Sequence, residues 1–207
     1  MSDPGGASPR VRRIALTGGI ATGKSYARDQ FGKLGIPTID SDTLAREVVA
    51  SGTPGFAAVL RRFGQSILAS GEIDRQKLGA IVFSDAAARR DLEEITHPAI
   101  RRSIDEWFAA LDPSRHPFAI ADIPLLYEVN REKEFDKVIV IACDPTTQLR
   151  RVMERMGTTE WDARKRLAAQ LPIDEKIGRA NYVIRTDGSL ADTDKQVKRV
   201  LEELKRA

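Results

Sequence analysis

Residues 18–25 read Gly-Gly-Ile-Ala-Thr-Gly-Lys-Ser, which fits the phosphate-binding pattern G-x-x-x-x-G-K-[ST]. The apolar run 13–17 precedes this stretch and a helical pattern follows it, as a strand, a glycine-rich turn and a helix N-terminus require. Glycines let the backbone turn tightly, so that its N–H groups point inward at phosphate oxygens. Lys24 is placed to reach the outer phosphates, and the Ser25 hydroxyl is placed to bind Mg²⁺. We therefore expect a nucleoside-triphosphate site here, the alternative being a glycine-rich turn that binds nothing.

Five short apolar runs, separated by helical patterns, indicate the fold class. They span 12–17, 36–40, 118–123, 137–142 and 181–185. Several are almost continuously apolar, which is typical of parallel strands buried on both faces. The predicted fold is therefore α/β: a P-loop NTPase three-layer fold with a five-stranded parallel sheet flanked by helices. The first helix should end near Leu34, with Gly35 at its C′ position.

A long helical insertion is expected between the second and third runs. Apolar residues recur there at helical spacing in three sets: Phe56, Val59, Leu60 and Phe63; Leu78, Ile81 and Val82; Ile100, Ile104, Phe108 and Leu111. Pro98 is expected at the start of the third helix. We interpret this insertion as a substrate-binding subdomain at the carboxyl edge of the sheet, where α/β proteins bind ligands.

A second insertion, about 145–178, is interpreted as a mobile lid over the phosphates. Its first helix carries Arg150, Arg151 and Arg155, and its second carries Arg164, Lys165 and Arg166. Gly157 should end the first of these helices, and Thr159 with Asp162 should cap the next. A solvated charged face is the alternative, and we prefer it for Arg150, Arg164 and Lys165. The last helix carries Val197, Val200, Leu201 and Leu204 on one side and is expected only to pack.

The bulk properties describe an ordinary globular chain. Its 207 residues suffice for one α/β domain with insertions, and a net charge of +3 does not require nucleic acid as a partner. The single cysteine, Cys143, excludes an internal disulfide and is read as a small core residue. No apolar stretch is long enough for a membrane span, and residues 1–10 read as a floppy tail without a signal peptide. The cytoplasm is the expected compartment.

Three carboxylates are candidates for chemistry. Asp40 and Asp42 follow the second run, where they would share a face of an extended segment, and Asp122 ends the third run. One carboxylate can accept a proton from an attacking hydroxyl, and another can hold metal-bound water. The alternatives are an Asx turn with a helix N-cap before Thr43 for the pair, and a strand-end cap for Asp122.

The sequence contains two histidines that could be site residues. His97 and Arg101 lie one helical turn apart and could touch an anionic substrate, although a lone histidine at a helix start is more often structural. His116 sits in a turn and receives no role.

Taken together, these motifs resemble the dephospho-CoA kinases over nearly the whole chain, from about Arg13 onward. The stretches that carry the resemblance are 16–25, 39–42 with 45–49, 97–101 and 122–126. The P-loop is generic, but this combination in this order and spacing is highly specific. The resemblance implies transfer of the ATP γ-phosphoryl group to the ribose 3′-hydroxyl of dephospho-CoA. From the P-loop and the strand-end carboxylates we expect Mg²⁺ at Ser25 and, through water, near Asp40 and Asp122.

The resemblance also implies roles for individual residues. Asp42 matches the family's proposed base and Arg151 its active-site arginine, with Lys24 as the third catalytic residue. The ATP-binding residues are Gly19, Ile20, Ala21, Thr22, Gly23, Lys24, Ser25, Tyr26 and the lid residue Arg155. The residues on the acceptor side are Asp42, Arg46, His97, Arg101 and Leu125.

Two residues depart from the family's usual P-loop. Ala21-Thr22 stands where the family usually has Gly-Ser, so we expect Ala21 to keep a negative φ. Tyr26 replaces a small hydroxyl residue; its N–H can still bind the α-phosphate.

The implied organisation is a disordered tail (1–10), a nucleotide-binding core (11–43, 116–144 and 179–207), a helical acceptor-binding domain (44–115) and a lid (145–178). The expected partners are ATP and dephospho-CoA, without nucleic acid or membrane, in a monomer or weak homo-oligomer. Two rivals stay open: another small-molecule P-loop kinase, for a nucleoside or a shikimate-like acceptor, and a non-enzymatic nucleotide switch of the GTPase type. Such switches read guanine with Asn-Lys-x-Asp, which does not occur in the sequence.

Overall fold

The computed structural model describes residues 10–206, so the predicted tail lies almost entirely outside the described residues. The described part forms two compact units: one runs up to Ile39 and resumes at Leu111, and the other is Asp40–Ala110. Among residues 10–206, none of the helices is long and apolar enough to cross a membrane.

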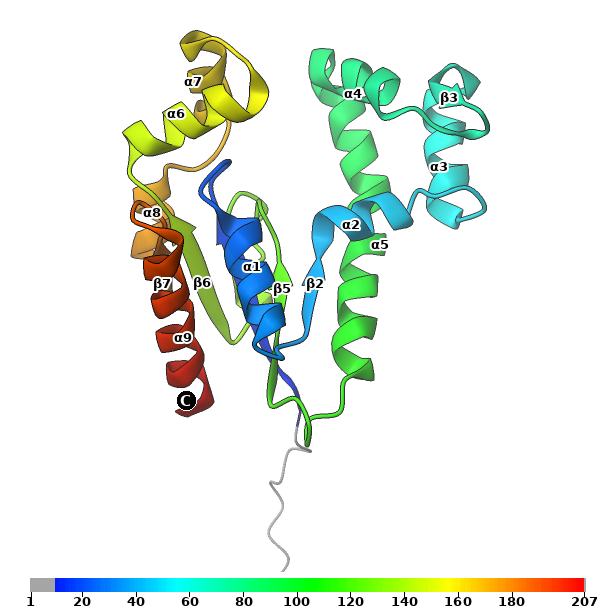
Figure 1. Cartoon of the computed structure of the whole chain (residues 1–207). Coiled ribbons are helices and arrows are strands. Elements are labelled where there is room, and N and C mark those ends of the chain that lie inside the picture. The colour runs from blue at the N-terminus through cyan, green and yellow to red at the C-terminus, as the bar shows by residue number, and fades with distance from the viewer. Residues whose placement is uncertain (1–9, 207) are drawn as a thin grey trace, which may run out of the picture. The chain divides into compact units, whose positions relative to one another are not determined.

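The first unit is built on a parallel sheet with the strand order β2-β5-β1-β6-β7 (Figure 1). These strands are β2 Thr38–Asp40, β5 Phe118–Asp122, β1 Arg12–Gly18, β6 Lys137–Ala142 and β7 Tyr182–Arg185. β1 is central, because it pairs in parallel with β5 on one side and with β6 on the other. The predicted α/β class and five-stranded parallel sheet flanked by helices are confirmed, and each of the five apolar runs overlaps a strand of this sheet.

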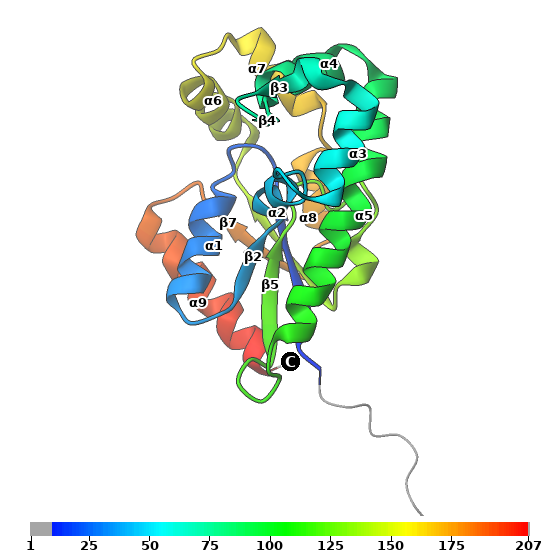
Figure 2. The ribbon, with the colours of Figure 1, turned by 90° about the vertical axis from the view of Figure 1, so that its right-hand side faces the viewer.

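Two helices, α1 Lys24–Lys33 and α9 Leu190–Arg206, pack against each other beside the sheet (Figure 2). They bury Phe31 of α1 and Val197, Val200, Leu201 and Leu204 of α9 in one core cluster with the strands. Gly35 has φ +82°, as the C′ position after α1 requires. Cys143 is buried as expected, and burial raises the pKa of its thiol.

The remaining helices of the first unit follow β6. They are α6 Pro145–Met156, α7 Glu160–Ala168 and α8 Ile173–Gly178, and η2 Glu132–Glu134 is a short 3₁₀ turn before β6. Gly157 ends α6 at φ +57°, and the Thr159 hydroxyl accepts a hydrogen bond from the N–H of Asp162. Both predicted signals at the join of α6 and α7 are confirmed.

The second unit is helical. It contains α2 Ser41–Glu47, α3 Pro54–Phe63, η1 Gln65–Ile67, α4 Arg75–Ser84 and α5 Ala86–Ala110, with the short strands β3 Leu68–Ala69 and β4 Glu72–Ile73. Its core gathers Val59, Ile67 and Leu78, with Phe63, Ile81 and Val82 packed against them. The three predicted helices exist. The β3–β4 hairpin was not predicted, and it turns on Ser70 and Gly71, both at positive φ.

Pro98 does not begin a helix, so that prediction is wrong: it lies inside α5. α5 begins twelve residues earlier, after Asp85, whose carboxylate accepts hydrogen bonds from the N–H groups of Ala87 and Ala88. An N-capping Asp followed by three alanines is a stronger start signal than the proline. Pro98 then costs the helix one backbone hydrogen bond, since proline has no N–H.

Candidate active site

The P-loop follows the central strand β1, and it bends where its glycines permit close approach and positive φ. A Cβ on Gly18 would lie 2.5 Å from the Ile141 carbonyl oxygen of β6, so only glycine fits beside that strand. Gly23 has φ +85° and precedes α1, whose first residues are Lys24 and Ser25. The loop thus delivers both residues to a helix N-terminus, where anions bind favourably.

Ala21 has φ +58°, so the prediction that it keeps a negative φ is wrong. The loop passes through positive φ at Ala21 and again at Gly23, the residue that precedes α1. For a residue with a Cβ this conformation costs roughly 1–2 kcal/mol. The surrounding contacts must therefore hold Ala21 in place.

The side chain of Tyr26 is committed to a structural contact. Its hydroxyl donates to Asp194 Oδ1 of α9 at 2.8 Å, and this hydrogen bond raises the pKa of the phenol. Tyr26 thereby joins the first turn of α1 to α9. Binding of the α-phosphate by its N–H stays a prediction.

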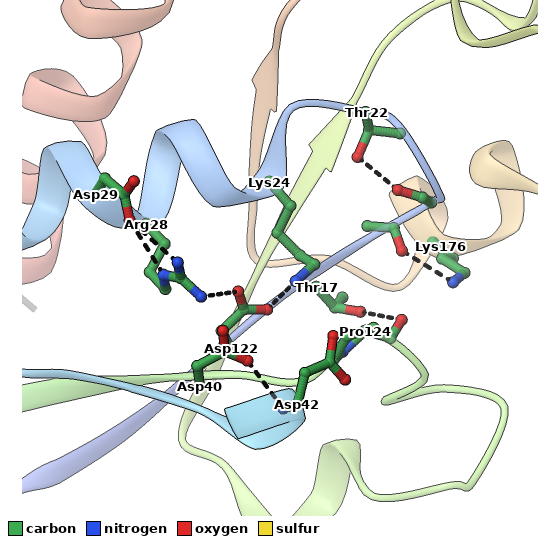
Figure 3. Close-up of polar contacts among 12 residues, drawn as sticks. Thr17, Thr22, Lys24, Arg28, Asp29, Asp40, Asp42, Asp122, Pro124 and Lys176 are labelled. Atoms are coloured by element: carbon green, nitrogen blue, oxygen red, sulfur yellow. Dashed lines mark hydrogen bonds and ion pairs between the residues drawn. The ribbon is translucent and has the colours of Figure 1, made fainter. Parts of the chain in front are cut away.

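Asp122, the last residue of β5, is held between two cations (Figure 3). Lys24 Nζ donates to its Oδ1, and Arg28 Nη1 donates to its Oδ2 at 3.3 Å. The carboxylate is 1% exposed, so its charge needs these partners. From the sequence, Lys24 was predicted to bind phosphate and Asp122 to lie near the metal. The structure brings these two side chains into direct contact. Arg28 was not singled out from the sequence.

Asp40 and Asp42 do not lie in one extended segment. β2 ends at Asp40 and α2 begins at Ser41, so Asp40 is the N-cap of α2, and its carboxylate accepts from the Asp42 N–H at 2.9 Å (Figure 3). The prediction that Asp40 and Asp42 share one face of an extended segment is therefore wrong. A helix N-cap exists as the alternative predicted, but the capping residue is Asp40 and not Asp42. No residue within 10–206 donates a hydrogen bond to the Asp42 carboxylate, which is exposed in the first turn of α2.

Arg151 of α6 contacts the end of β7. Its Nη1 donates to the Thr186 hydroxyl at 2.9 Å, and its Nη2 donates to the Thr186 carbonyl at 2.6 Å. The same hydroxyl donates to the carbonyl of Thr22 in the P-loop at 2.7 Å. Arg151 is therefore connected to the P-loop through Thr186, which was not predicted as a site residue. Arg155, one turn further along α6, is exposed.

The expected acceptor residues divide between the two units. Arg46 lies on α2, and His97 and Arg101 lie on α5, all three exposed. A surface hollow on α5 is lined by His97, Pro98, Arg101, Arg102, Asp105 and Glu106. Leu125 belongs to the first unit, in the segment after β5, and is 44% exposed.

A buried ion pair fixes α8 beneath the P-loop. Lys176 is fully buried, and its Nζ lies 2.6 Å from Glu128 Oε1 and donates to the Gly18 carbonyl at 3.3 Å. Glu128 Oε1 also accepts from the Leu171 N–H. The predicted lid range 145–178 therefore includes a helix, α8, that is anchored to the core.

This pair gives a stability prediction. Glu128→Gln should lower the free energy of unfolding by about 3 kcal/mol, because it leaves the Lys176 ammonium buried without its counter-charge. Lys176→Met should cost less, since Glu128 is 16% exposed and keeps the Leu171 N–H. Urea unfolding of both variants measures the difference. Equal losses, or a larger loss for Lys176→Met, would contradict this asymmetry.

The P-loop on a central parallel strand and the helical insertions place the chain in the class of P-loop kinases. The solved shikimate kinase of Acinetobacter baumannii shares this fold, with a TM-score of 0.53 at 17% identity. The superposition covers 95% of this chain and 94% of the shikimate kinase chain. A family model described as dephospho-CoA kinase matches residues 12–192, so the chain belongs to the dephospho-CoA kinase family.

Individual relatives of the chain are also named dephospho-CoA kinase. The chain is 45% identical to the dephospho-CoA kinase of Anaeromyxobacter dehalogenans, over 94% of this chain and 93% of that protein. It is 42% identical to that of Arabidopsis thaliana, over 95% of this chain and 85% of that protein. The solved dephospho-CoA kinase from Campylobacter jejuni superposes with a TM-score of 0.71 at 31% identity, over 93% and 96% of the two chains. This family of kinases uses ATP and completes coenzyme A synthesis, as the resemblance implied.

Proposed function

We propose that this chain transfers the γ-phosphoryl group of ATP to the ribose 3′-hydroxyl of dephospho-CoA, giving coenzyme A and ADP. The observation that carries the proposal is a complete G-x-x-x-x-G-K-S loop inside a chain that matches the family model from residue 12 to residue 192. In the reaction, the 3′-oxygen attacks the γ-phosphorus in line, and the bond from that phosphorus to the β,γ-bridging oxygen breaks. ADP leaves with the bond electrons, and the hydroxyl proton passes to a carboxylate.

In this proposal Lys24 binds either Asp122 or the phosphates of the nucleotide. In the structure its ammonium donates to Asp122. When a triphosphate enters the loop, Lys24 turns to the outer phosphates, and Arg28 keeps Asp122 paired. The exchange avoids leaving the 1% exposed carboxylate without a counter-charge.

The donor set around the loop fits Mg²⁺. The exposed Ser25 hydroxyl and the Asp122 carboxylate are hard oxygen ligands, and residues 10–206 hold no cluster of three or more His, Cys, Asp or Glu side chains arranged for a metal. Mg²⁺ typically keeps several waters and binds one or two protein oxygens together with substrate phosphates. Ser25 would hold the ion, with Asp122 and Asp40 acting through water. Bound there, it would neutralise charge on the phosphates.

Two side chains carry the proposed chemistry. Asp42 orients the 3′-hydroxyl and accepts its proton. Arg151 stabilises the negative charge that develops on the transferred group, in a site from which closure of the lid excludes water. Arg46, His97, Arg101 and Leu125 contact the acceptor, and Arg155 contacts the nucleotide.

The direct test is to incubate the purified protein with ATP, MgCl₂ and dephospho-CoA and to quantify coenzyme A by chromatography. We expect formation of coenzyme A with one ADP per product. Shikimate and a set of nucleosides, offered with radiolabelled ATP, test the rival kinase, and GTP hydrolysis without an acceptor tests the nucleotide switch. Phosphorylation of another acceptor in preference to dephospho-CoA would overturn the proposal.

The compartment and the assembly are proposed as the sequence predicts them: a cytoplasmic protein that is a monomer or a weak homo-oligomer. Sedimentation at several protein concentrations tests the second point.

A further inference from the structure

Two glutamine side chains hold Ile20, at the tip of the P-loop. Gln148 Nε2 donates to the Ile20 carbonyl at 2.8 Å, and Gln170 Oε1 accepts from the Ile20 N–H at 2.9 Å. Gln148 lies in the second turn of α6, and Gln170 follows the end of α7. Both ends of the α6–α7 segment are therefore bonded to one residue of the loop.

Gln148 is built into its place. It is only 7% exposed, and a Cβ on Gly19 would collide with its amide nitrogen. The start of α6 is fixed by Asp144, whose carboxylate accepts from the Thr146 hydroxyl and from the N–H groups of Thr146 and Thr147. These hydrogen bonds hold the pKa of Asp144 well below its usual range, so the cap is ionised at neutral pH.

The contacts of α6 flank the strained residue. Gln148 holds the carbonyl of Ile20, which precedes Ala21. Arg151, one turn along the same helix, holds Thr186, whose hydroxyl donates to the carbonyl of Thr22, which follows Ala21. Ala21 itself has φ +58°. Residues of α6 thus hold the Ile20–Ala21 peptide directly, through Gln148, and the Thr22–Gly23 peptide indirectly, through Arg151 and Thr186.

We propose that Gln148, assisted by Gln170, is a positioning residue for the nucleotide: it holds the Ile20–Ala21 peptide so that the P-loop keeps its phosphate-binding shape despite an alanine at a left-handed position. The inference rests on the proposed ATP site. It makes the α6–α7 segment a support for the loop, in addition to its role as a carrier of Arg151.

The test is a double-mutant cycle read by the affinity for MgATP, measured by isothermal titration calorimetry. Gln148→Ala should weaken MgATP binding about two- to twelvefold, the fold-change that corresponds to one lost hydrogen bond. In the Ala21→Gly background, the same substitution should weaken binding by less than about twofold, because glycine adopts the left-handed conformation without strain. Gln170→Ala should also weaken binding.

Gln196→Ala is the matched control. Gln196 alone makes the two kinds of backbone hydrogen bond that Gln148 and Gln170 make between them, here with the N–H and the carbonyl of Arg185, outside the P-loop. We expect its MgATP affinity to match that of the unsubstituted protein within about twofold. Gln148→Glu, which keeps the shape but places a carboxylate against the Ile20 carbonyl, should lose at least as much affinity as Gln148→Ala and serves if the alanine variant does not fold.

The outcomes separate cleanly. An unchanged affinity for Gln148→Ala or Gln148→Glu, or an equal loss in the Ala21 and Ala21→Gly backgrounds, would overturn the inference. Because the readout is nucleotide binding, it is independent of the acceptor: a protein that binds MgATP but makes no coenzyme A would refute the proposed function and leave this inference standing. The KM for dephospho-CoA should stay within about twofold in the alanine variant, whereas the KM for ATP rises.

Discussion

Replacing Arg151 with alanine is expected to lower kcat by about 10³- to 10⁵-fold, the range associated with an arginine that stabilises a phosphoryl-transfer transition state. MgATP affinity should fall only several-fold, since the guanidinium meets its full counter-charge only while the phosphoryl group is in transit. Some loss of affinity is expected because Arg151 also supports the P-loop through Thr186. Single-turnover kinetics at saturating substrates separate the two effects.

Arg150→Ala is the matched control for this experiment. Arg150 is the neighbour of Arg151 on α6, but its guanidinium forms an exposed ion pair with Glu154 on the same helix. Its loss should leave kcat nearly unchanged, as expected for a solvated charge. Arg151→Lys should recover little activity, because an ammonium cannot reproduce a planar fork of donors. Near-normal turnover in Arg151→Ala would remove the catalytic role and leave Arg151 as a support for Thr186.

The strands of the sheet could be predicted because their signal is local. Residues 118–122 and 138–142 are buried throughout. Continuous apolar runs such as these indicate parallel strands even when only one sequence is known. The P-loop and Gly35 are equally local, since each depends on a conformation that few residues adopt.

Predictions failed where two local signals competed. Pro98 is a good first residue of a helix, yet Asp85 and the alanines after it began α5 earlier. Asp40 and Asp42 each suit a cap, and the sequence alone did not show which one the end of β2 would select. At Ala21 the preference of the residue was outweighed by the path of the loop.

Other features were invisible because they join distant parts of the chain. Nothing in the sequence around Gln148 points to a P-loop more than a hundred residues earlier, and glutamine has no distinctive pattern. No local pattern shows that the Thr186 hydroxyl bonds to Thr22 either. Lys176 received no prediction from the sequence, and it is fully buried beside Glu128. The only local indication of this burial is that Lys176 lies close in sequence to two apolar residues, Ile173 and Ile177.

Replacing Asp42 with asparagine is expected to slow phosphoryl transfer by about 10²- to 10⁴-fold, the usual contribution of a positioned general base. The amide has almost the same shape, but it cannot accept the proton of the 3′-hydroxyl at neutral pH. Its backbone N–H still bonds to the Asp40 cap, so α2 should form normally. Calorimetry should therefore show both substrates bound with little change, while rapid-quench measurements show slow formation of coenzyme A.

Glu47→Gln supplies the comparison, because Glu47 is an exposed acid on the same helix and loses the same charge. If both variants slow the reaction equally, the effect belongs to the charge of α2 and not to a base at position 42. If Asp42→Asn stays fast, Asp42 is only a favourable acid in the first turn of α2, where it complements the helix dipole. The proton of the 3′-hydroxyl would then have to leave through solvent or the transferred phosphoryl oxygens, and catalysis would rest on Lys24, Arg151 and the metal.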